Sequence, residues 1–190
     1  MTWNAMRSAA GILAGVALLG AFPALAQIQA SESDKSFVAS TLALSQAGIQ
    51  SANLAQQKST SADVRQFAQK VAGDHATLNQ QAQALAQQMS LTVDANPASN
   101  RYLASASRMQ TLSGSAFDQE FIRGEMANLS MALRKFDSEI ATTQDPMLKQ
   151  QAQASAKTIT RDLHQAQVLA QAHSVQPARR MVAASSPART

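Results

Sequence analysis

Residues 62–89 have the sequence ADVRQFAQKVAGDHATLNQQAQALAQQM, in which apolar side chains recur every three or four positions. On a helix this spacing gathers one continuous stripe, made of Val64, Phe67, Val71, His75, Leu78, Ala82, Leu85 and Met89. Alanine and glutamine dominate the rest of the chain, and no stretch alternates apolar and polar residues as a strand does. The sequence therefore predicts an all-α protein.

Three more helices are expected, each with a recognisable start. A hydroxyl residue followed three positions later by a carboxylate is the spacing of a capping box, and an acid followed by proline suits the first helical turn. These patterns occur at Ser31 to Asp34, Thr60 to Asp63, Ser115 to Asp118 and Asp145-Pro146. The predicted helices span about 34–57, 62–89, 116–142 and 146–173.

The connections between these helices predict their arrangement. Residues 58–61 and 143–145 are short links, so each flanking pair is expected to form an antiparallel hairpin. The link 90–115 is long, and its residues 98–112 can form a short extra helix. A long middle crossover between two hairpins is typical of ferritin-like four-helix bundles. We expect one bundle domain over residues 34–175.

Residues 1–26 have the layout of a signal peptide. Arg7 precedes an apolar run that is too short to span a bilayer, and Pro23 ends it. The small residues before Gln27 predict cleavage between Ala26 and Gln27. We expect a linker over residues 27–33, a disordered basic tail over residues 176–190, and export to the periplasm or outer envelope without a membrane anchor.

Composition excludes several classes of function. The chain has no cysteine, which rules out disulfides, thiolate metal sites and a cysteine nucleophile. Its formal charge of +4 arises at the two ends, because residues 27–176 carry 12 acidic side chains and an equal number of basic ones. A neutral body does not favour a nucleic-acid partner.

Several short patterns resemble the bacterial exported family named domain of unknown function 4142. They are Phe37 with Leu54-Ala55-x-x-Lys58, then Val64-x-x-Phe67-Ala68 with Asp74-His75, and Leu112-Ser113-Gly114-x-x-Phe117-Asp118-x-x-Phe121-Ile122. The similarity covers roughly residues 34–172. It implies a ferritin-like helical bundle, exported to the periplasm or outer envelope, with no established activity.

The resemblance also implies polar positions inside the bundle, and this chain departs from them. Family members usually carry a histidine in the third helix and another in the fourth, where this sequence has Leu129 and Asp162. A glutamate common in the first helix falls near Gly48 here. Only the family's second-helix histidine is matched, by His75.

Three residues are the candidates for a metal site: His75, Glu125 and Asp162. A di-iron bundle needs Glu-x-x-His pairs on two helices, and none occurs in this sequence. For His75 we favour a hydrogen bond to an ordinary polar neighbour in the bundle over a role as ligand. We expect Glu125 to be solvated at the edge of the core, and Asp162 to lie at the surface together with His164.

These observations predict an exported, non-catalytic bundle that acts as an envelope or stress-associated binding module, with no cofactor and an unknown envelope partner. The alternative is a ferritin-like protein that binds iron or another divalent metal, or an oxidase, using His75, Glu125 and Asp162. A third hypothesis gives the tail, residues 177–190, a role in binding to the envelope surface.

Overall fold

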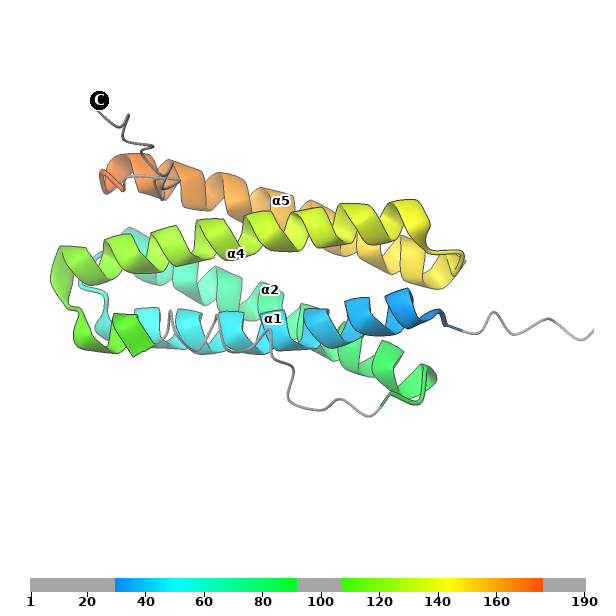
Figure 1. Ribbon diagram of the computed structural model, residues 1–190. Helices are drawn as coiled ribbons and strands as arrows, with labels where there is room; N and C mark the ends of the chain where they lie inside the picture. Colours follow the sequence, from blue (N-terminus) through cyan, green and yellow to red (C-terminus); the bar gives the residue numbers. More distant parts are fainter. Residues whose placement is uncertain (1–29, 92–106, 176–190) are drawn as a thin grey trace, which may run out of the picture.

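The protein is an all-α bundle of two helical hairpins (Figure 1). The computed structural model describes residues 30–91 and 107–175. Its four long helices are α1 (Glu32–Lys58), α2 (Ala62–Gln88), α4 (Gly114–Thr142) and α5 (Pro146–Ala172). The predicted fold class and the four predicted helices are confirmed, with ends that differ by no more than two residues.

The connections place each helix beside two others. Tight links at residues 59–61 and 143–145 fold α1 against α2 and α4 against α5, and the hairpins join where α1 packs on α4 and α2 on α5. In Figure 1, α2 ends and α4 begins at opposite ends of the bundle. The link between them must therefore span the length of the bundle, which explains why it is long.

Two of the four predicted helix starts have the expected capping. Ser31 and Asp34 form a complete capping box, and the Asp145 carboxylate accepts the backbone N–H groups of Met147 and Leu148. The other two predictions were wrong. Helix α2 follows Ser61 rather than Thr60, and α4 begins at Gly114, where a φ of 55° suits glycine, so Ser115 lies inside the first turn.

Aromatic pairs mark two levels of the apolar core. Phe37 of α1 meets Phe136 of α4 edge to face, with ring centroids 4.8 Å apart. Towards the other end of the bundle, Phe67 of α2 and Phe121 of α4 are 6.1 Å apart. The section between these pairs is unusual, because several polar side chains are buried there.

Part of the crossover closes one end of the core. Residues 107–111 are helical, and Met109 is buried. The Lys58 ammonium holds this segment in place by donating to the carbonyl oxygens of Met109 and Gln110, at 3.2 and 2.6 Å, and it lies 5.4 Å from the Phe117 ring centroid.

Several predictions concern residues outside the described ranges. These are the signal peptide with its cleavage site at Ala26 and Gln27, residues 27–29 of the linker, most of the extra helix 98–112, and the tail 176–190. Within residues 30–91 and 107–175, no helix is long and apolar enough to cross a membrane.

Candidate functional site

His75 lies in the middle of the bundle, on the buried face of α2. The side chain is 5% exposed, and its ring rests against Gly48 of α1. A β-carbon at position 48 would lie 2.4 Å from Nε2 of the imidazole, which is far inside van der Waals contact. The glycine therefore provides the space in which the ring fits, and it explains a glycine in the interior of a long helix.

The imidazole of His75 is neutral and incompletely hydrogen-bonded. Burial lowers its pKa to about 4, although the nearby charge of Asp74 acts in the opposite direction. The Nδ1 atom is buried and has no hydrogen-bond partner among the described residues. The ordinary polar neighbour that we expected for this histidine is thus not found at Nδ1.

Glu125 is in the core, so the prediction of a solvated position was wrong. The side chain is 1% exposed, and its Oε1 accepts a 2.9 Å hydrogen bond from the Ser51 hydroxyl of α1. Its Oε2 is buried and has no partner in the part of the chain that the structure describes. Burial raises the pKa of Glu125 to about 7, the Ser51 bond opposes this rise, and the charge of Asp162 adds to it. This carboxyl group therefore titrates near neutral pH, well above the range of an ordinary glutamate.

Asp162 is also buried, with 3% exposure, which corrects the prediction that it lies at the surface. Its carboxylate contacts the Lys70 ammonium of α2, and that ammonium also binds Asp74 at 2.7 Å. Arg161 lies 3.2 Å from Asp74 and 3.6 Å from Asp162. His164, by contrast, is exposed as expected. Two acids and two bases thus form a balanced network between α2 and α5.

The pKa values of the two acids in this network shift in opposite directions. Burial raises the pKa of Asp162 above its ordinary value, although contact with Lys70 opposes the rise. Burial also acts on Asp74, but the hydrogen bond and the charge of Lys70 outweigh it and hold the pKa of Asp74 below its ordinary value. At neutral pH, Asp74 is the more fully ionised of the two partners of Lys70.

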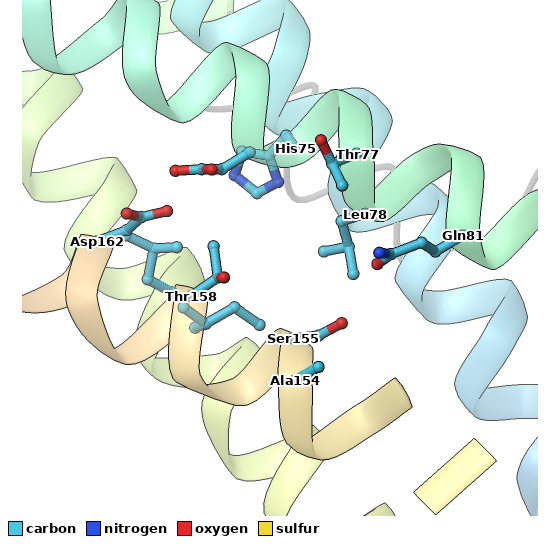
Figure 2. Close-up of a pocket in the computed structure, with 11 residues that line it drawn as sticks. His75, Thr77, Leu78, Gln81, Ala154, Ser155, Thr158 and Asp162 are labelled. Atoms are coloured by element: carbon cyan, nitrogen blue, oxygen red, sulfur yellow. The ribbon is translucent and has the colours of Figure 1, made fainter. Parts of the chain in front are cut away.

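A cavity of about 140 Å³ lies between α2 and α5 at the level of His75 (Figure 2). In Figure 2 the imidazole projects from α2 toward Asp162 and Thr158 of α5. The walls combine aliphatic, hydroxyl, amide and charged side chains: Asp74, His75, Thr77, Leu78, Gln81, Leu129, Ala154, Ser155, Thr158, Ile159 and Asp162. The cavity can hold a small molecule that has both apolar and hydrogen-bonding parts.

The three metal candidates do not form a metal centre in the described part of the chain. No group of three or more histidine, aspartate or glutamate side chains there is placed to hold an ion. His75 and Asp162 both line the cavity, whereas Glu125 does not. Lys70 already occupies the carboxylate of Asp162, so an ion would have to displace it.

Sequence reasoning missed two residues that shape this site, Ser51 and Lys70, and it named Gly48 only as the position of the family's first-helix glutamate. Only Lys70 had a local indication, because it precedes Asp74 by four positions and this spacing favours an ion pair on a helix. The contact between Lys70 and Asp162 joins residues that are 92 positions apart. Such a pairing depends on how the two hairpins pack together, so the sequence of neither segment alone predicts it.

Comparison with known proteins identifies relatives but no activity. A sequence profile described as domain of unknown function DUF4142 matches residues 20–169. Among solved structures, a DUF305 protein from Streptomyces coelicolor shares the fold, with a TM-score of 0.66 and 10% identity over 76% of this chain and 96% of that chain. No curated protein matches the chain.

Proposed function

The chain belongs to the DUF4142 family of unknown function, and we propose that it is an exported, non-catalytic binding module that holds a small molecule in the cavity between α2 and α5. One observation carries the proposal: a buried, neutral imidazole with an unpaired Nδ1 forms part of the wall of a cavity of about 140 Å³. Leaving a buried polar atom unpaired costs about 1–3 kcal/mol. A ligand that bonds to this nitrogen, after a small rotation of the ring, recovers that cost.

The charges around the cavity favour an uncharged ligand. Asp74 and Asp162 are already paired with Lys70 and Arg161, so a further ion would disturb a balanced network. The aliphatic part of the wall, Leu78, Leu129 and Ile159, favours an apolar body. Apolar cavities of roughly 150 Å³ accept a single six-membered ring. The fitting ligand class is an uncharged ring compound with one hydroxyl group.

Phenol and benzene are the probes that test this proposal, because they differ by the one hydroxyl. We expect phenol to bind about two- to tenfold more tightly than benzene, since one added hydrogen bond contributes about 0.5–1.5 kcal/mol. A hydroxyl can serve either tautomer of the ring, because it both donates and accepts. Titration calorimetry measures the two affinities. Equal affinities would contradict the role of the imidazole.

Two variants and one control locate the binding. In His75→Phe an aromatic ring remains but the nitrogens are lost, so the preference for phenol should disappear. Thr158→Leu fills part of the cavity and should weaken the binding of both probes, whereas Thr160→Leu changes an exposed neighbour on the same helix that does not line it. If Thr158→Leu and Thr160→Leu bind phenol as the wild type does, the cavity is not the binding site.

The alternative function is that of a metal binder or oxidase. It draws support from a neutral imidazole that shares a cavity with the carboxylates of Asp74 and Asp162. Elemental analysis of protein purified from its native compartment, compared with His75→Ala, separates the alternatives. Stoichiometric metal that is lost in the variant, or turnover of oxygen with ferrous iron, would favour this function over the non-catalytic module.

Export is the part of the proposal that rests on residues 1–26. A basic residue, a short apolar run and small residues before Gln27 are the features that signal peptidase recognises. Mass spectrometry of the mature protein should find Gln27 as its first residue. Deleting residues 177–190 and measuring envelope association at low salt tests whether the basic tail binds there.

A further inference from the structure

A second buried acidic cluster lies at the end of the bundle where α1 begins and α4 ends. Asp34 of α1 and Glu139 of α4 are each 4% exposed, and their carboxyl groups are hydrogen-bonded to each other. A hydrogen bond between two carboxyl groups needs a proton, because two ionised carboxylates in contact repel each other strongly. The contact between these helices therefore contains one bound proton.

The surroundings assign the proton to Glu139. The Asp34 carboxylate also accepts the backbone N–H of Ser31 at 2.8 Å, and it lies in the first turn of α1, where the helix dipole favours a negative charge. Among residues 30–91 and 107–175, Glu139 has no such donors, and its Oε1 is buried there without a partner. Asp34 is consequently the ionised acceptor, and protonated Glu139 is the donor.

The shifts in pKa agree with this assignment. Burial tends to raise the pKa of Asp34, but its hydrogen bonds with Glu139, Ser31 and Thr143 outweigh burial and lower it. Burial, the hydrogen bond with Asp34 and the charge of Asp34 raise the pKa of Glu139 to about 7. In the described residues, no charged group from α2 or α5 forms an ion pair with either carboxyl group.

The pair connects segments that are otherwise held by side-chain packing and by a 3.2 Å hydrogen bond from the Lys135 ammonium of α4 to the Ser40 hydroxyl of α1. Asp34 opens the first hairpin, and Thr143 begins the loop that turns the second, where its own hydroxyl accepts the Asp145 backbone N–H. One turn further into the bundle, Phe37 and Phe136 meet in the last aromatic layer. Loss of the Asp34–Glu139 contact would therefore loosen the seam between the hairpins at the layer that closes this end.

We propose that Asp34 and Glu139 form a proton-operated latch between the two hairpins. The shared proton ties the start of α1 to the end of α4, and its loss in mildly alkaline medium places two buried negative charges in contact and opens this end of the α1–α4 seam. A protein outside the cytoplasm meets changes in external pH directly, so the latch couples the packing of the bundle to acidity. The latch does not depend on the ligand cavity.

Hydrogen–deuterium exchange, corrected for intrinsic rates, tests the latch along the whole chain. Between pH 5.5 and pH 8 we expect the protection of residues 32–41 and 133–142 to fall by about tenfold or more. The segments around the Phe67–Phe121 pair should lose less protection, and their loss should persist in Glu139→Gln, because Glu125 titrates in the same range. Protection that does not depend on pH at the Asp34–Glu139 end would overturn the proposal.

Three variants provide the controls. Glu139→Gln and Asp34→Asn each replace one carboxyl with an amide that can donate without a titrating proton, so each should remove the dependence on pH. Asp137→Asn removes an exposed charge on the same helix, and this variant should keep the dependence of protection on pH. If Glu139→Gln responds to pH as Asp137→Asn does, the latch is wrong. Should an amide variant fail to fold, a carbon NMR titration of wild-type Glu139 decides: the proton must be lost near pH 7 rather than near pH 4.

Discussion

A methyl group at position 48 would occupy space that the imidazole of His75 already fills. Its carbon would lie 2.4 Å from Cδ2 and Nε2 and 2.7 Å from Cε1 of the buried ring, so the ring or the helix would have to shift. Overpacking of this kind costs about 1–3 kcal/mol, from which the better helix propensity of alanine recovers about 0.5–1 kcal/mol. We expect Gly48→Ala to destabilise the protein by about 1–2 kcal/mol in urea unfolding.

A second glycine provides the matched control for Gly48→Ala. Gly73 is exposed inside α2, and a β-carbon there would meet nothing within 4 Å, so Gly73→Ala should stabilise the protein by about 0.5–1 kcal/mol. Combining Gly48→Ala with His75→Ala should restore much of the loss. Equal effects of the two glycine substitutions would show that the ring does not press on position 48.

Single residues also show why part of the site could not be predicted from sequence. Glu125 and Asp162 were expected in solvent, because a carboxylate is rarely buried without a partner. Each has a partner, but these partners, Ser51 and Lys70, are 74 and 92 positions away along the chain. Asp34 was recognised as part of a helix cap, yet its second contact, with Glu139, exists only once the hairpins have docked.

At the scale of the helices, Lys70 is the charged link from α2 to α5. Its ammonium contacts Asp162, which is 3% exposed, and Asp74. Removing one partner of a buried pair costs about 3–5 kcal/mol, but the Lys70 side chain is 32% exposed, so water reduces this cost. We expect Lys70→Ala to lower the free energy of unfolding by about 1–3 kcal/mol.

An exposed ion pair is the control for this prediction. Lys35 contacts Glu32 at 2.7 Å across one turn of α1, and the Glu32 side chain is 90% exposed. Such pairs contribute at most about 0.5 kcal/mol, so Lys35→Ala should be nearly neutral. Adding Asp162→Asn to Lys70→Ala should recover stability, because the unpaired buried charge is then gone. If stability does not recover, the destabilisation by Lys70→Ala comes from the lost packing of its aliphatic chain and not from the unpaired charge.

The helices themselves were largely predictable, for reasons that lie within each segment. Apolar spacing gave the buried faces, and Asp145-Pro146 and the Ser31 box marked real starts, because capping bonds form within one turn. The pattern failed at Thr60 and Ser115, where the same spacing occurs but the chain enters the helix one or two residues earlier or later. A capping pattern shows that a start is nearby, and the loop geometry selects the residue.

For the whole molecule, the buried titratable groups predict where stability is greatest. Glu125 and Glu139 have pKa values of about 7 when folded and about 4.5 when unfolded, so their contribution is complete below pH 4.5 and is lost as pH rises through 7. His75 acts in the opposite direction: its pKa falls from 6.5 to about 4, so its contribution is complete above pH 6.5 and is lost on acidification.

Between pH 4.5 and pH 7, a rise in pH lowers the free energy of unfolding through the two glutamates and raises it through the histidine. The two glutamates outweigh the one histidine. With about 1.4 kcal/mol for each pKa unit, we expect the wild type to be more stable at pH 5.5 than at pH 8, by about 1–3 kcal/mol in urea unfolding. A double variant, Glu125→Gln with Glu139→Gln, should reverse this preference, because only the histidine then titrates. His75→Phe should enlarge the stability difference between pH 5.5 and pH 8 that the wild type shows. A wild type whose stability rises steadily from pH 5.5 to pH 8 would mean that these two glutamates are ionised in the folded bundle.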